Sequence, residues 1–209
     1  MNRNLLSGVT AVVLNKNGGK TLAQALSSLS WCNERVVLDD HSQDNSEHIA
    51  QQFHALWTSK SVQSEFAAQR NHALTLARYN WTLFIDADEY ISDALREEIK
   101  RSLPTTTDTG FRMQRIDTFM GKKLRYGETG SLFLLRLAQT TSGVWERPVH
   151  EYWNVQGKVG TFRSPLMHAP HISISSFLGK IDQYTTIEVK HRFHLGKRFY
   201  VIECIIFPF

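Results

Sequence analysis

Short apolar runs alternate with segments of helical periodicity over the first half of the chain, and this alternation limits the fold more than any other feature. Four runs are typical of buried strands, at residues 8–15, 35–38, 55–58 and 82–85. The segments 22–29, 44–53, 64–79 and 91–103 carry apolar residues at helical spacing. Strands that alternate with helices predict an α/β domain, with a mostly parallel central sheet and helices on both faces.

The second half of the chain has a different pattern. Residues 110–160 are rich in aromatic residues, glycine and short alternating runs, which predicts antiparallel strands and loops. A chain of 209 residues is long enough for one domain with a sizeable core. We expect this domain over residues 1–172, divided near residue 103, and a helical tail over 173–209.

Net charge and cysteine content exclude few classes of function. The net charge of +4 suits nucleic acid, an anionic membrane or a phosphorylated substrate, but the basic residues do not cluster with aromatic residues as nucleic-acid-binding surfaces require. Two cysteines are too few for a disulfide framework. The first fifteen residues hold no signal peptide and no stretch is long enough to span a membrane, so we expect a cytoplasmic protein.

Two of the expected strands end in acidic residues. Asp39 and Asp40 follow the second strand, and Asp86 and Asp88 follow the fourth. Ligands of open parallel sheets bind at the carboxyl ends of strands, and carboxylates are the ligands that Mg²⁺ and Mn²⁺ prefer. We predict that Asp86 and Asp88 bind such a cation; the alternative is a solvated turn before the helix near Ser92.

Two further residues are candidate nucleotide ligands. Asp40 has a carboxylate that can accept hydrogen bonds from a base or a ribose hydroxyl. Arg70, on the third expected helix, has planar donors suited to a nucleotide or its phosphates. The alternative for Arg70 is an ordinary exposed helical arginine.

Five segments, in this order, resemble family 2 glycosyltransferases: residues 9–15, 36–44, 66–71, 81–89 and 145–151. Within that family the sequence is most similar to bacterial lipopolysaccharide core β-1,4-glucosyltransferases. The resemblance implies a GT-A fold, a sugar nucleotide donor and inversion at the anomeric carbon. It also implies donor-binding roles for residues of the first half and a metal and diphosphate motif: Thr10 and Val12 at the base pocket, Asp40 at the base, Arg70 at the nucleotide, and Asp86 with Asp88 at the metal.

The catalytic base is expected in the second half, which would form the acceptor side of the domain. An inverting transfer needs a carboxylate that takes a proton from the acceptor hydroxyl. The family commonly has a Glu-Asp pair here, whereas this chain has His150 and Glu151. We predict Glu151 as the base; the alternatives are that it pairs with Arg147 or Arg163, or that Asp117 is the base.

Histidines and the C-terminal tail leave alternatives open. His168 or His171 can complete a metal site, and we name His171 as the third ligand, although lone histidines are more often structural. Basic residues before the apolar segment 199–209 suit an anionic membrane surface, but the segment equally suits a last core element.

The leading hypothesis is transfer of glucose from UDP-glucose to a lipid-linked or oligosaccharide acceptor of the lipopolysaccharide core, at the cytoplasmic face of the inner membrane. One alternative is a nucleotidyltransferase, but residues 17–20 only weakly match the glycine-rich phosphate loop that such an enzyme needs. Another alternative is a protein that binds a nucleotide sugar without turnover.

Overall fold

The computed structural model describes residues 5–61, 66–119, 122–124, 132–147 and 151–169, and the helical residues 182, 185, 186 and 189. Residues Met1–His171 form one compact unit and Ile172–Phe209 a second. The expected tail helix otherwise lies outside the described residues, as do the apolar segment 199–209, His150 and His171. Within the described ranges, no helix is long and apolar enough to cross a membrane.

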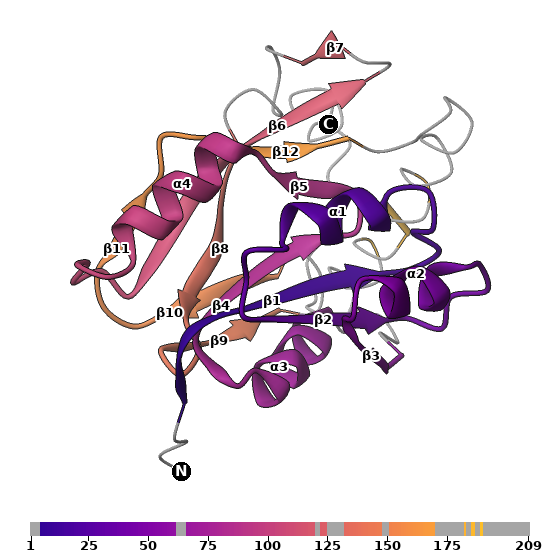
Figure 1. Ribbon diagram of the computed structural model, residues 1–209, viewed down its shortest axis with the longest axis horizontal. Coiled ribbons are helices and arrows are strands. Elements are labelled where there is room, and N and C mark those ends of the chain that lie inside the picture. The colour runs from indigo at the N-terminus through magenta and orange to yellow at the C-terminus, as the bar shows by residue number, and fades with distance from the viewer. Residues whose placement is uncertain are drawn as a thin grey trace. The chain divides into compact units, whose positions relative to one another are not determined.

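The first unit is built around one ten-stranded sheet (Figure 1). Its main path runs in the order β3-β2-β1-β4-β8-β6-β12-β5. The strands of this path are β1 (Leu6–Asn15), β2 (Glu34–Asp39), β3 (Leu56–Ser59), β4 (Tyr79–Asp86), β5 (Glu89–Ile91), β6 (Gly110–Phe119), β8 (Phe133–Gln139) and β12 (Leu166–His168). Two short strands, β7 (Lys122–Lys123) and β11 (Val159–Thr161), pair with β6, and β9 (Gly143–Glu146) pairs with β10 (Tyr152–Val155) in a separate hairpin.

The parallel part of the sheet confirms the α/β fold expected from the alternating pattern. Strands β3, β2, β1 and β4 are parallel neighbours, whereas β8 runs antiparallel between β4 and β6. The expected antiparallel second half is only partly present, because β11 and β12 pair in parallel with β6. The connecting helices are α1 (Leu22–Ser28), α2 (Ser46–Gln52), α3 (Phe66–Leu76) and α4 (Asp93–Ser102).

Two helices are shorter than expected because neighbouring residues belong to strands. The third expected helix ends at Leu76, because β4 already begins at Tyr79 and pairs with β1. The fourth begins at Asp93 rather than at Ile91. Ser92 caps it by accepting a hydrogen bond from the Leu95 amide at 3.3 Å, and Ile91 instead belongs to β5, which pairs with β12.

Each face of the sheet has its own core, because alternate strand residues point to opposite faces. On one face, Ala11 and Val13 of β1 pack with buried residues of α1, α2 and α4. On the other face, Val12 packs with Phe84 of β4, with α3 and with two tryptophans of the β9–β10 hairpin. The sheet is therefore covered on both faces.

Phe84 is the centre of the second core. Its ring has no exposed surface and meets the edges of Trp145 and Trp153, each with centroids 5.2 Å apart. We expect Phe84→Ala to lower the free energy of unfolding by about 3–5 kcal/mol, because a cavity replaces these contacts. Urea denaturation would measure the loss, with Phe133→Ala as the matched control, since Phe133 is 48% exposed. Equal losses in both variants would contradict this assignment of the core.

Candidate active site

The acidic strand ends lie on either side of the end of β1. Asn15 pairs with Asp39 of β2, and Leu14 pairs with Asp86 of β4. The polar ends of three neighbouring parallel strands therefore meet at one edge of the sheet, which is where open α/β sheets bind ligands.

Two loops beside this edge are joined by hydrogen bonds. The Asn17 amide donates to Ser42 Oγ at 2.7 Å, and the Gly19 amide donates to Asp44 Oδ2 at 2.8 Å. A Cβ atom at Gly19 would lie only 2.2 Å from Asn45 Oδ1. Contact between these loops therefore accounts for Gly19 without a phosphate loop.

Asp39 and Asp40 have different surroundings. Asp39 is 2% exposed and accepts hydrogen bonds from Asn15 Nδ2 and from the amide of Ser42, both at 2.8 Å. Asp40 keeps 11% of its side chain exposed and pairs with Lys16 Nζ at 2.7 Å. Asp39 is thus a structural residue, and Asp40 stays the predicted contact for the nucleotide base.

Thr10 and Val12 are buried in the middle of β1. Both have no exposed area. The Thr10 hydroxyl donates to Glu34 Oε2 at 2.8 Å at the first residue of β2, and Val12 lies in the second core. The expected role of both residues at the base pocket stays a prediction.

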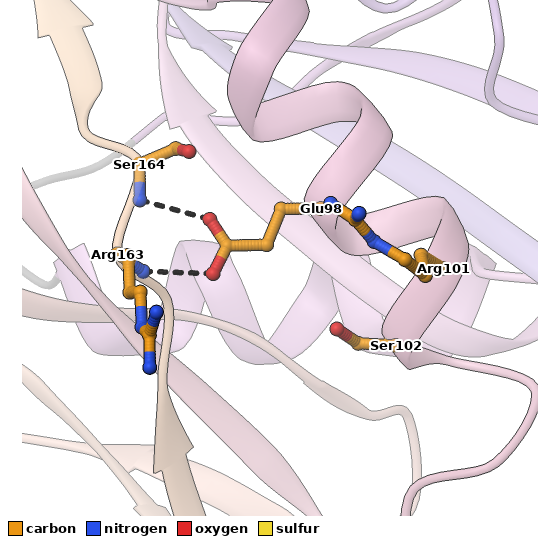
Figure 2. A pocket seen from close by; sticks show the side chains of 5 residues that line it. All are labelled: Glu98, Arg101, Ser102, Arg163 and Ser164. Atoms are coloured by element: carbon orange, nitrogen blue, oxygen red, sulfur yellow. Dashed lines mark hydrogen bonds between the residues drawn. The ribbon is translucent and has the colours of Figure 1, made fainter.

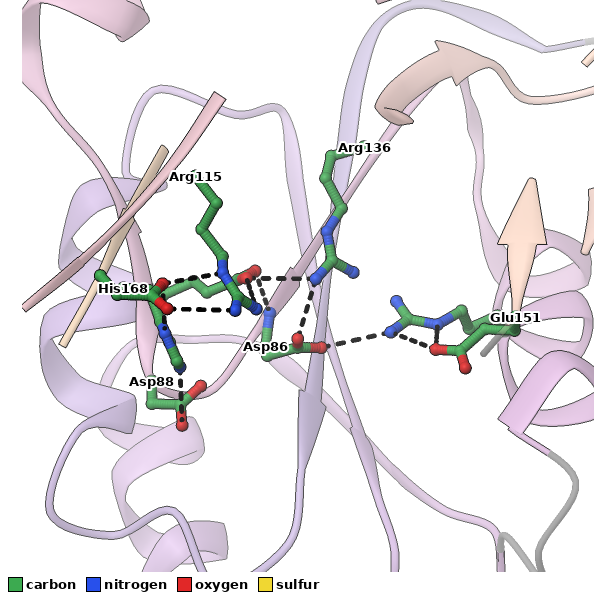
Figure 3. A network of polar contacts seen from close by, with 9 residues as sticks. Asp86, Asp88, Arg115, Arg136, Glu151 and His168 are labelled. Carbon is green, nitrogen blue, oxygen red and sulfur yellow. Dashed lines mark hydrogen bonds and ion pairs between the residues drawn. The ribbon is translucent and has the colours of Figure 1, made fainter. Parts of the chain in front are cut away.

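Asp86 is held between two arginines (Figure 3). Its Oδ2 accepts from Arg136 Nη2 at 2.9 Å, and its Oδ1 accepts from Arg70 Nη2 at 3.3 Å. Burial alone would raise the pKa of Asp86, but the charges of the two arginines outweigh it and hold the pKa well below its usual range. Asp86 is therefore ionised, and both of its oxygens are engaged.

Asp88 faces a histidine that is itself oriented by a second carboxylate (Figure 3). His168 Nε2 lies 3.4 Å from Asp88 Oδ2, and His168 Nδ1 lies 2.9 Å from Asp117 Oδ1. Burial alone would lower the pKa of His168, but the contacts with Asp88 and Asp117 raise it above its usual value. In the neutral ring, an Nδ1–H bonded to Asp117 would leave the Nε2 lone pair directed toward Asp88, which is how proteins orient metal-binding histidines.

Three further charged residues connect these groups, and the sequence analysis did not identify them. Arg136 Nη2 also donates to Glu89 Oε1 at 3.1 Å, and Arg115 Nε lies 2.9 Å from Asp117 Oδ1. Burial raises the pKa of Glu89, whose side chain has no exposed surface. A charged residue within an apolar strand, such as Arg136 in residues 132–138, was the available signal, because a buried arginine must be paired.

Arg70 joins Asp86 to Glu151. Its Nε donates to Glu151 Oε1 at 3.0 Å, and its guanidinium carbon lies 4.6 Å from the ring centroid of Trp145. Asn71 fixes the same hairpin by exchanging two 2.8 Å hydrogen bonds with the Trp145 backbone. Arg70 is 4% exposed, so the alternative of an exposed helical arginine is wrong, and its nucleotide contact stays a prediction.

The partner of Glu151 differs from the two alternatives named for it. Its described ion pair is with Arg70, at 2.9 Å. Arg163 instead lines a separate hollow of about 410 Å³ beside α4, where Glu98 accepts hydrogen bonds from the Arg163 and Ser164 amides (Figure 2). None of the residues that line this hollow belongs to the strand-end network.

Together these contacts form one network of nine side chains (Figure 3). It contains two more carboxylates than guanidinium groups, which suits a bound cation. Among the described residues no cluster of three or more metal-ligating side chains is present, but the Asp88–His168 pair offers an oxygen and a nitrogen ligand. The members are Arg70, Asp86, Asp88, Glu89, Arg115, Asp117, Arg136, Glu151 and His168.

The chain is similar to known glycosyltransferases in sequence. It is 26% identical over 198 residues to the lipopolysaccharide core biosynthesis glycosyltransferase LpsC of Rhizobium meliloti, a match that covers 91% of this chain and 73% of LpsC. An uncharacterized glycosyltransferase of Rickettsia typhi is 24% identical over 209 residues, covering 91% of this chain and 70% of that protein.

Solved structures share the fold at low sequence identity. S. aureus TarS 1-349, determined in complex with UDP-GlcNAc, superposes with a TM-score of 0.60 at 14% identity, over 80% of this chain and 60% of that one. Glucosyl-3-phosphoglycerate synthase from Mycobacterium tuberculosis, determined with Mn²⁺, UDP and glucosyl-3-phosphoglycerate, gives a TM-score of 0.58 at 13% identity, over 88% and 79%.

The family assignment follows from the match over most of the described domain. Residues 10–164 match the family described as Glycosyl transferase family 2, a range that contains most of β1, the elements from α1 through β11 and every predicted site residue except His168 and His171. The chain therefore belongs to glycosyltransferase family 2 and is a glycosyltransferase of the GT-A fold.

Proposed function

We propose that this glycosyltransferase moves a hexose, glucose from UDP-glucose, onto a lipopolysaccharide core or a similar surface glycan, with inversion. The observation that carries the proposal is the network at the carboxyl end of β4, which has a candidate cation site, Asp88 with His168, at one end and Glu151 at the other. The similarity to LpsC supports the core acceptor. Because that acceptor is lipid-linked, the reaction would take place at the cytoplasmic face of the inner membrane.

A divalent cation, Mg²⁺ or Mn²⁺, is part of the proposal. Asp88 and His168 would hold it, and Asp117 would keep the His168 ring in place. When bound, the cation neutralises the charge that develops on the departing diphosphate. Asp86 is less suited to be a direct ligand, because both of its oxygens bond arginines, and its expected metal contact stays a prediction.

Glu151 is the proposed base. In an inverting transfer the acceptor oxygen attacks the anomeric carbon from the side opposite UDP, the bond from that carbon to the phosphate oxygen breaks, and a carboxylate takes the hydroxyl proton. Arg70 orients Glu151, since it donates to one oxygen and leaves the other outside this contact. The base and Asp86 are thus fixed relative to each other through one side chain.

A thermal-shift screen of nucleotide sugars tests the donor and the cation together. At a ligand concentration of 100 Kd, binding stabilises a protein by about 2.7 kcal/mol, which for a chain of this size raises Tm by roughly 5–10 °C. We expect that shift with UDP-glucose plus Mn²⁺, and a smaller one when Mn²⁺ is replaced by a chelator.

GDP-mannose and UDP-galactose are the matched competitors in this screen. An equal shift with GDP-mannose would contradict a uridine donor, and an equal shift with UDP-galactose would contradict the choice of glucose. Release of UDP that depends on an added core oligosaccharide then separates an enzyme from a protein that only binds the donor.

A further inference from the structure

Arg136 is a buried charged residue to which the proposed function gives no role. It lies in β8, the strand that pairs antiparallel with β4, and only 7% of its side chain is exposed. Leu135 and Leu137 flank it in the sequence, and Leu137 is fully buried. A guanidinium group in such a place loses most of its hydration. Its hydrogen bonds and ion pairs within the protein must offset the cost of that loss.

Those contacts all lie on the turn that carries Asp88. One nitrogen, Arg136 Nη2, bonds Asp86 Oδ2 at 2.9 Å and Glu89 Oε1 at 3.1 Å. The other oxygen of Glu89 accepts the Asp86 amide at 2.9 Å. Asp86 and Glu89, which lie on either side of Asp88 in the sequence, are therefore tied to each other and to β8.

The described hydrogen bonds of Arg136 go to these carboxylates. Its bonded nitrogen is shared by both, and its Nε is buried without a partner among the described residues. The charges of Asp86 and Glu89 raise the pKa of Arg136 despite its burial, so the side chain stays charged. Through these two bonds Arg136 acts on the residues on either side of Asp88.

We propose that Arg136 is a positioning residue for donor binding, which fixes the Asp86–Glu89 turn so that Asp88 points at the cation of the nucleotide diphosphate. This proposal rests on the proposed function, because it assumes that Asp88 contacts the cation. The substrate class concerned is the cation complex of a nucleoside diphosphate sugar. Arg136 acts on it from the neighbouring strand, through Asp86 and Glu89.

Replacing Arg136 with glutamine tests the proposal. Partners that hold metal ligands in place typically change metal affinity by about 10–100-fold, and we expect Arg136→Gln to raise the Mn²⁺ concentration needed for half-maximal UDP binding by that factor. In transfer assays of this variant at saturating Mn²⁺, kcat should return much closer to its wild-type value than KM for the donor does. Arg136→Lys, which keeps the charge but places its donor nitrogen differently, should recover only part of the Mn²⁺ affinity.

A second variant separates positioning from folding. Arg136→Gln removes the guanidinium group nearest to Asp86 and Glu89 and can destabilise the chain, whereas Glu89→Gln combined with Arg136→Gln removes one charge of each sign. We expect the double variant to regain thermal stability but to keep the raised Mn²⁺ requirement. Arg96→Gln, on the exposed side of α4, should match the wild type in both measurements.

Each outcome decides between the two proposals. If wild-type protein binds UDP with Mn²⁺ and the double variant binds it equally well, the positioning role is overturned while the proposed function stands. If the wild type shows no Mn²⁺-dependent UDP binding, the proposed function fails first. Calorimetric titration below the melting temperature of every variant keeps unfolding out of the comparison.

Discussion

Asp88→Ala is expected to remove the Mn²⁺-dependent part of UDP binding. Loss of the carboxylate takes away the proposed oxygen ligand and leaves His168 Nε2 without the partner that lies 3.4 Å from it. The affinity for UDP in the presence of Mn²⁺ should fall by at least roughly 100-fold, which is the upper end of the effect of residues that only hold a metal ligand in place. Calorimetric titration of UDP, with Mn²⁺ and with a chelator, measures both parts of the binding.

Asp93→Ala is the control for that variant. Asp93 also lies just after the strand-end region, but it begins α4 and its side chain is 89% exposed, so it should not affect UDP binding. Unchanged Mn²⁺-dependent binding in Asp88→Ala would remove the cation role from this carboxylate. A loss of binding in both variants would point to a general effect of acidic charge.

The sheet and its acidic edge could be predicted because both are local properties of the sequence. A buried strand such as Trp81–Ile85 is recognisable from its own residues, and a carboxylate that follows it must lie at the strand end. Strands joined by right-handed crossovers through helices run parallel, so their carboxyl ends lie at one edge of the sheet. These two facts place Asp39 and Asp86 at the same edge from the sequence alone.

The network could not be predicted, because its contacts join residues that are far apart in the sequence. Arg136 meets Asp86 only because β8 pairs antiparallel with β4, and His168 meets Asp117 because β12 pairs in parallel with β6. No periodicity specifies either pairing. Single charges in apolar strands indicated that partners must exist, but not which residues they are.

The burial of Thr10 could not be predicted from the resemblance. Resemblance aligned the first strand with the nucleotide-binding half of the family, but it did not say which positions stay uncovered. Thr10 lies opposite the first residue of β2, and both faces of the sheet are packed there. At the end of the strand, by contrast, Lys16 and Asp40 form an exposed ion pair.

Glu151→Gln is expected to keep donor binding and lose transfer. General base catalysis contributes about 10²–10⁴-fold to a rate, and we expect kcat to fall by that factor while the affinity for UDP with Mn²⁺ is retained. The amide oxygen of glutamine can still accept the hydrogen bond from Arg70 Nε, so the side chain keeps its place. Glu146→Gln, on the same hairpin, should retain transfer, because its carboxylate bonds Tyr152 and Asn154 instead of the network.

Asp117→Asn separates the two candidate bases. Asp117 is 7% exposed and bonds His168 and Arg115, so its loss should disturb the cation site and raise the Mn²⁺ requirement. The same change should leave substantial kcat at saturating Mn²⁺, because the proton would still be taken by Glu151. The opposite pattern, in which Glu151→Gln transfers normally and Asp117→Asn loses kcat at unchanged Mn²⁺ affinity, would assign the base to Asp117. Arg70 would then hold Glu151 for a structural reason alone.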